Sequence, residues 1–182
     1  LHAQNFHRRF DGIVFVLLSL SAFALECGDT ITESIVLTDD IQCSNNYGLV
    51  IGADNIVLDC NYNALVGTGN FGIYSSERYD ITIKNCLLSG WKVGLYLDKN
   101  YNDVIQNNYV TNSTVTGYYL LGSEDNEFKE NFALDNKEGI SLLYSSNNTI
   151  YSNTIGDNEY GLYLSSSSGN LLYDNSLINT NN

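Results

Sequence analysis

A repeat of about 22 residues constrains this chain more than any other feature. Glycines followed by short apolar runs recur at intervals of 22 or 23 residues, at Gly72, Gly94, Gly117, Gly139 and Gly161. Asparagines recur with nearly the same period, at Asn85, Asn107, Asn131, Asn153 and Asn175. Two independent markers that share one period indicate a solenoid built from stacked, similar units.

Apolar residues in each repeat alternate over four to six positions between clusters of Asn, Gly, Ser and Asp, which predicts short strands rather than helices. Strands that keep a constant phase across brief turns favour a coil of three strands, in which each coil pairs in parallel with the next. We therefore predict an all-β fold: a right-handed parallel β-helix of six or seven coils over residues 49–182. Residues 25–48 are expected to form an entry or cap segment, and the last repeat, which lacks a closing glycine, predicts that the helix continues past residue 182.

Alternation assigns the side chains after each glycine to two surfaces. The first and third positions are expected to point inward: Ile73, Leu95, Tyr118, Ile140 and Leu162, then Ser75, Leu97, Leu120, Leu142 and Leu164. The second position is expected to point outward and carries mostly tyrosine: Tyr74, Tyr96, Tyr119, Ser141 and Tyr163. The glycines suit tight bends, and the asparagines suit turns with a left-handed backbone. Because the spacing between apolar residue and Asn changes after Asn107, we expect a bulge or a shifted register there.

The N-terminus has the outline of a secretory signal peptide. Basic residues at 7–9 precede a nearly continuous apolar run over 12–25 with small residues at its end, so we predict a leader over residues 1–24. The run is shorter than the roughly 20 residues that an apolar helix needs to cross a bilayer, which disfavours a membrane anchor. We expect a secreted or cell-surface protein, periplasmic if the host has two membranes, with no membrane span after cleavage.

Charge limits the possible partners. The chain has 21 acidic and 8 basic residues, a formal net charge of −13, and no His or Met follows residue 24. Nucleic acid is excluded as a partner because phosphate binding needs clustered cations. The same repulsion disfavours polyanionic glycans unless a divalent cation bridges the like charges.

Four cysteines, Cys27, Cys43, Cys60 and Cys86, lack the Cys-x-x-Cys spacing that is typical of zinc sites. In an exported chain they predict disulfides, and we favour Cys27 with Cys43 and Cys60 with Cys86. The alternative is that Cys60 and Cys86 pack reduced in the core.

Asn112 and Asn147 begin sequons for N-glycosylation. The cluster of Glu124, Asp125 and Glu127 offers carboxylates for Ca²⁺ but lacks the spacing of a dedicated calcium loop, so exposed charge is the preferred interpretation. We predict no other metal site and no organic cofactor.

The phrases Leu-Asp-Cys-Asn at 58–61, Ile-Thr-Ile-Lys-Asn-Cys at 81–86 and Asn-Thr-Ile-Tyr-Ser-Asn at 148–153 resemble those of parallel β-helix repeat proteins of the NosD type, many of them archaeal. The resemblance covers about residues 27–182 and implies a carbohydrate-binding or sugar-hydrolase-like β-helix. In the NosD branch it also implies a periplasmic role in copper supply. This chain departs from that role, because soft copper ligands are lacking after the leader.

Two functions follow. A non-catalytic module would bind a polysaccharide or cell-surface glycan by stacking sugar rings on the outward residues Tyr74, Tyr96, Tyr119 and Tyr163; the alternative role of these tyrosines is to cover and stabilise the sheet. A polysaccharide lyase or glycoside hydrolase would need carboxylates around a scissile bond, and Asp98 and Asp103 are weak candidates because they flank a loop where acids are ordinary turn residues. We favour the module.

Overall fold

The computed structural model describes residues 25–44 and 46–182, and these residues form three seven-stranded sheets. The first sheet contains β1 (Asp29–Ile31), β4 (Tyr47–Ile51), β7 (Phe71–Ser76), β10 (Val93–Asp98), β13 (Thr116–Leu121), β16 (Glu138–Leu143) and β19 (Tyr160–Ser165). The second contains β2 (Ile35–Val36), β5 (Val57–Asp59), β8 (Thr82–Lys84), β11 (Val104–Gln106), β14 (Glu127–Lys129), β17 (Thr149–Tyr151) and β20 (Leu171–Tyr173). The third contains β3 (Ile41–Cys43), β6 (Ala64–Gly67), β9 (Leu87–Ser89), β12 (Tyr109–Thr111), β15 (Phe132–Leu134), β18 (Thr154–Gly156) and β21 (Ser176–Ile178).

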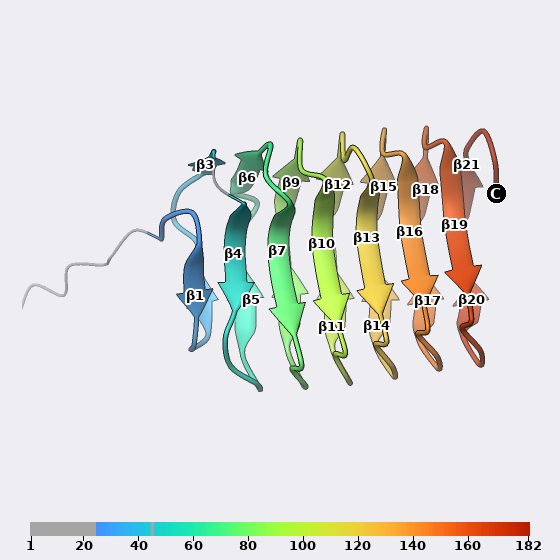
Figure 1. Cartoon of the computed structure of the whole chain (residues 1–182), viewed down its shortest axis with the longest axis horizontal. Coiled ribbons are helices and arrows are strands. Elements are labelled where there is room, and N and C mark those ends of the chain that lie inside the picture. Colours follow the sequence, from blue (N-terminus) through green and yellow to red (C-terminus); the bar gives the residue numbers. More distant parts are fainter. Residues whose placement is uncertain (1–24, 45) are drawn as a thin grey trace, which may run out of the picture.

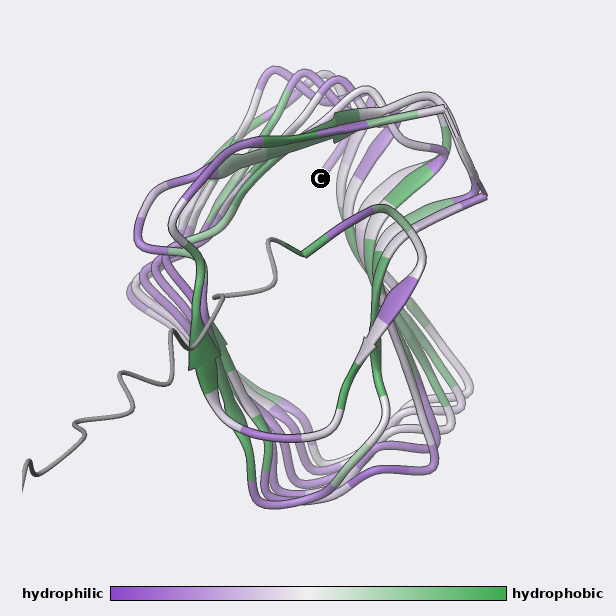
Figure 2. Ribbon diagram, turned by 90° about the vertical axis from the view of Figure 1, so that its left-hand side faces the viewer, coloured by the Kyte–Doolittle hydropathy of each residue, from purple (hydrophilic) through white to green (hydrophobic). Residues whose placement is uncertain are grey.

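Each coil contributes one strand to each sheet, and every strand pairs in parallel with the equivalent strands of the neighbouring coils. In Figure 1 the strands of the first sheet run downward on the near side, the chain returns upward behind them, and it advances from left to right, which is right-handed winding. Viewed along the axis, the coils superpose, with hydrophobic residues along the straight sides and hydrophilic residues at many of the corners (Figure 2). The predicted right-handed parallel β-helix is therefore confirmed, with seven coils.

Residues 25–48, expected as an entry segment, carry β1, β2 and β3 of the first coil, and β1 pairs with β4. The predicted leader, residues 1–24, lies outside the described residues. In the part of the chain that the structure describes, no helix has the length and apolar character needed to cross a bilayer.

The interior is lined by the apolar columns that alternation predicts. Ile73, Leu95, Tyr118 and Ile140 are fully buried, and so are Leu97, Leu120 and Leu142 in the second inward column. Two members of these columns, Ser75 and Tyr118, are polar and are also fully buried. The Tyr118 hydroxyl shares its proton between the carbonyl oxygens of Asn108 at 2.9 Å and Phe132 at 3.2 Å. Leu164, in the last coil, is 41% exposed because no described coil covers it.

The repeated glycines lie within the strands of the first sheet and not at bends, which corrects the prediction. A Cβ atom on Gly117 would lie 2.7 Å from the carbonyl oxygen of Gly139, and one on Gly94 would lie 2.8 Å from that of Gly117. The repeated glycine is therefore required for the close approach of successive coils.

The repeated asparagines occupy two different positions, which also corrects the prediction. Asn85 and Asn107 have a left-handed backbone, with φ of 56° and 54°. Asn131 and Asn153 point inward, where each side-chain oxygen accepts the backbone N–H of the equivalent residue one coil earlier, at 3.0 and 2.9 Å. Similar inward columns run through other corners and satisfy the backbone donors that the turns leave unpaired.

The predicted bulge is wrong, because the second sheet keeps a continuous register from Ile83 through Ile105 and Phe128 to Ile150. The change of spacing in the sequence arises because asparagine moves from the turn position to the adjacent inward position. In the earlier coil that inward position is held by Cys86, whose backbone N–H donates to Asn108.

Both predicted disulfides are confirmed. Cys27 and Cys43 join the start of the first coil to its third strand, and Cys60 and Cys86 join successive coils, with Cα–Cα distances of 5.6 and 4.7 Å. Cys60 and Cys86 are fully buried, so the second disulfide is part of the core. Trp91 is also fully buried, and its indole N–H donates to the carbonyl oxygen of Leu65 at 3.0 Å.

Candidate functional site

The predicted tyrosine ladder lies on the outer face of the first sheet. Strand pairing places Tyr74, Tyr96 and Tyr119 side by side on β7, β10 and β13. The ring centroids of Tyr74 and Tyr96 are 5.6 Å apart with planes at 7°, and those of Tyr96 and Tyr119 are 5.3 Å apart with planes at 19°. The three rings form one stacked aromatic surface, because coil spacing in a parallel β-helix matches the distance at which offset rings stack.

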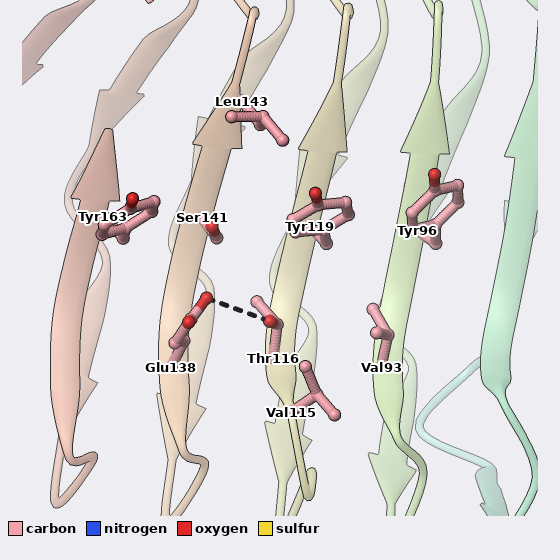
Figure 3. A pocket seen from close by; sticks show the side chains of 9 residues that line it. All are labelled: Val93, Tyr96, Val115, Thr116, Tyr119, Glu138, Ser141, Leu143 and Tyr163. Atoms are coloured by element: carbon pink, nitrogen blue, oxygen red, sulfur yellow. Dashed lines mark hydrogen bonds between the residues drawn. The ribbon is translucent and has the colours of Figure 1, made fainter. Parts of the chain in front are cut away.

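The ladder is interrupted at Ser141 on β16 and resumes at Tyr163 on β19. Around this interruption lies a cavity of ≈ 370 Å³, within the usual range for small-molecule sites. Figure 3 shows its lining side chains along four neighbouring strands: Val93, Tyr96, Val115, Thr116, Tyr119, Glu138, Ser141, Leu143 and Tyr163.

Burial and neighbouring carboxylates favour the neutral form of two ladder phenols, Tyr96 and Tyr119. Burial, together with the charge of Asp98, raises the pKa of Tyr96 to about 12. Burial and the neighbouring Glu138 carboxylate also raise the pKa of Tyr119. Tyr96 and Tyr119 therefore offer uncharged rings with hydroxyl groups that can donate hydrogen bonds at any physiological pH.

Glu138 was not identified from the sequence as a site residue. It is half-buried at the cavity, where its Oε2 accepts a hydrogen bond from the Thr116 hydroxyl at 3.2 Å. The sequence does contain a signal for Glu138. It stands directly before the repeated glycine, at the position that Phe71 and Thr116 hold in earlier coils and that lines the same face of the sheet.

The structure does not place the two candidate catalytic acids on one open surface. Asp98 is half-buried on β10 and accepts a hydrogen bond from the Ser76 hydroxyl at 3.1 Å. Asp103 is only 1% exposed; its carboxylate accepts from the backbone N–H of Ile81 at 3.0 Å and from Asn100 Nδ2 at 2.8 Å. Burial raises the pKa of Asp103 to about 7, but the hydrogen bonds tie its carboxylate to Asn100 in its own turn and to Ile81 in the preceding coil.

A second outward column runs along the second sheet. Asp59 and Lys84 are partners in the register of β5 and β8 and form an ion pair at 3.2 Å. Beyond Gln106 the column continues with Lys129, Tyr151 and Tyr173. Glu130, Ser152 and Asp174, which follow these three residues in the chain, occupy the neighbouring turn position with a left-handed backbone.

The suggested calcium ligands are not gathered into a metal site among the described residues. Glu127 accepts hydrogen bonds from Lys129 Nζ and the Tyr151 hydroxyl, while Asp125 lies exposed in a turn with φ of 58°. Glu124 is half-buried next to it. The two sequon residues, Asn112 and Asn147, are both exposed at turns, where a glycan could be attached.

Comparison with known protein families gives one finding. The family model described as "Periplasmic copper-binding protein (NosD)" matches residues 28–182, which is nearly the whole described chain. Searches of curated proteins and of solved structures give no match.

Copper in proteins is held chiefly by His, Cys and Met side chains. Residues 25–182 contain no His and no Met. All four cysteines there are in disulfides, and the described residues include no group of three potential ligands from His, Cys, Asp and Glu. These residues therefore do not fit a copper ion.

Proposed function

We propose, from the premise that this chain belongs to the NosD family, that it is an exported β-helix module that binds carbohydrate on the outer face of its first sheet. The observation that carries the proposal is the stacked surface of Tyr74, Tyr96 and Tyr119 beside the cavity at Ser141. Flat aromatic rings bind the apolar C–H faces of sugars, while hydroxyl and carboxylate groups at their edges bind the sugar hydroxyls.

Export is supported independently of the ligand. Two disulfides are typical of chains that fold outside the cytoplasm, and the family's description is periplasmic. Both observations fit a periplasmic or extracellular protein.

The side chains support binding more than cleavage. Asp103, one of the acids that could serve a hydrolase, is buried and engaged with backbone. The cavity contains a single carboxylate, Glu138, whereas glycoside hydrolysis generally requires a pair.

The test is retention on immobilised neutral glycans, with soluble product release measured in the same samples. We expect Tyr96→Ala with Tyr119→Ala to lower retention at least about fivefold, because two stacking surfaces of about 0.5–1.5 kcal/mol each are removed. The matched control is Tyr151→Ala with Tyr173→Ala, which removes a stacked pair of 5.0 Å on the second sheet and should change retention less than twofold.

Failure of the wild-type protein to bind any glycan would refute the proposal, as would unchanged retention in the ladder variant. Depolymerisation of a glycan by the wild-type protein would show that it is an enzyme and not a non-catalytic binding module.

A further inference from the structure

We infer that the interruption at Ser141 is a subsite for one sugar ring, selective for neutral or amino sugars over uronic acids. This inference rests on the proposed function and specifies where and what the module binds. Register places Ser141 in the ladder column, between Tyr119 one coil before it and Tyr163 one coil after it. The neighbouring tyrosines are thus separated by two coil spacings, about 9.6 Å. Ser141, predicted to point outward into solvent, is only 2% exposed and forms the floor of the cavity, so a sugar ring would lie above it against the tyrosine rings and Glu138.

A second column explains why the interruption is a cavity and not a shallow dip. Next to the ladder, the sheet carries Tyr47, Phe71, Val93, Thr116, Glu138 and Tyr160 in successive coils. Phe71 fills the space beside Tyr96, at 4.8 Å between ring centroids. Beside Tyr119 and Ser141 the corresponding residues are Thr116 and Glu138, so both columns lack rings at the same place.

The polar groups of the cavity suit a hydroxylated ring. No hydrogen bond within the described residues involves the hydroxyls of Tyr119, Ser141 or Tyr163, and Glu138 Oε1 is also without one. Figure 3 shows Ser141 between the two tyrosines, with Glu138 on the same strand towards Thr116. A sugar would satisfy these groups, whereas an aromatic side chain of a protein partner would leave them without partners.

Charge decides between classes of sugar. Glu138 is the one charged side chain that lines the cavity, and no Lys or Arg lines it. A uronic acid or sulfated sugar would bring a second negative charge beside this carboxylate without a compensating cation. A neutral sugar donates hydrogen bonds from its hydroxyls to the carboxylate, and an amino sugar adds an attractive charge.

The decisive variant is Ser141→Tyr, which completes the ladder and fills the subsite. We expect it to lower binding of neutral and amino-sugar oligosaccharides at least tenfold, measured by calorimetry, with a thermal unfolding midpoint equal to or above that of the wild type. Ser141→Ala keeps the space open and removes one hydroxyl, so it should weaken binding only a few-fold, much less than Ser141→Tyr. Tyr173→Ala, on the second sheet, should change affinity less than twofold.

Glu138→Gln tests the charge argument. It should weaken binding of neutral oligosaccharides several-fold and raise the affinity for oligogalacturonides relative to them. Equal exclusion of oligogalacturonides by Glu138→Gln and wild type would contradict the assigned selectivity.

The outcomes separate this inference from the proposed function. If Ser141→Tyr keeps or strengthens binding while Tyr96→Ala with Tyr119→Ala abolishes it, the ladder binds glycan and the subsite is refuted. If the wild type binds none of the oligosaccharides, or binds only an aromatic amino-acid amide, both proposals fail.

Discussion

Asp103 supports a quantitative prediction because its environment is an asparagine ladder in which it is the one acid. In the same inward column, Asn126 and Asn148 each accept the backbone N–H of the preceding coil and donate from Nδ2 to a further acceptor. Asp103 accepts in the same way but, when ionised, has no proton to donate. Burial, which the hydrogen bonds from Asn100 and Ile81 only partly offset, raises its pKa from 3.8 to about 7.

The sign of the pH effect follows from linkage. Between pH 4 and 7 the folded protein holds a proton on Asp103 that the unfolded chain releases, so the free energy of unfolding falls as the pH rises through this range. At 1.36 kcal/mol per pH unit, the difference between the two pKa values corresponds to at most about 4 kcal/mol. Asp103→Asn removes this penalty, because the amide has nearly the shape of the neutral acid.

We therefore expect the stability of Asp103→Asn, relative to wild type, to increase by about 2 to 4 kcal/mol between pH 4 and pH 8. The assay is urea unfolding followed by the fluorescence of Trp91, the only tryptophan, at constant ionic strength. The matched variant is Asn148→Asp, which places a carboxylate at a fully buried rung two coils away and should be destabilised more at pH 8 than at pH 4. A stability difference for Asp103→Asn that is constant over this range would refute the reasoning.

Two further predictions concern the coil itself. Gly117→Ala places a methyl group 2.7 Å from the Gly139 carbonyl oxygen, so it should lower the free energy of unfolding by about 2 kcal/mol or more. Gly122→Ala meets a Lys99 side-chain carbon at 3.5 Å, an ordinary contact, so its loss should be limited to the cost of a left-handed backbone, about 1 kcal/mol. Equal losses in urea unfolding would contradict the role of Gly117 in the close approach of the coils. Cys60→Ala with Cys86→Ala removes the disulfide that closes a loop between residues 26 positions apart, and should lower the free energy of unfolding by about 3 to 4 kcal/mol. A loss no larger than that of Cys27→Ala with Cys43→Ala, at the terminal coil, would count against a core role for the second disulfide.

The sequence was sufficient to predict the fold because one repeat determines the strands, the inward and outward side chains and the stacking of the coils. Tyr118 illustrates this: its place in the inward column predicts that a polar-tipped side chain is buried, and the structure buries it completely. The same column logic fails between neighbouring positions, since Asn107 and Asn131 look equivalent by spacing but occupy a turn and the interior, respectively. Asparagine suits both places, so residue type alone does not distinguish them.

The candidate site could be predicted only in part. The outward tyrosines follow from alternation, and Ser141 is visible in the sequence as the one exception among them. The cavity also depends on Thr116 and Glu138, which leave the adjacent column without a ring beside Ser141. Recognising this requires the register of four neighbouring strands. The burial of Asp103 was likewise hidden, because an acid beside a loop is ordinarily exposed.

The most direct test of the account is a crystal structure of the protein soaked with a neutral oligosaccharide that it retains. The account predicts electron density for a sugar ring over Ser141, between the rings of Tyr119 and Tyr163, with a hydroxyl within hydrogen-bond distance of Glu138. Density for the sugar on another face, such as the one carrying Tyr151 and Tyr173, with the space at Ser141 empty, would contradict it.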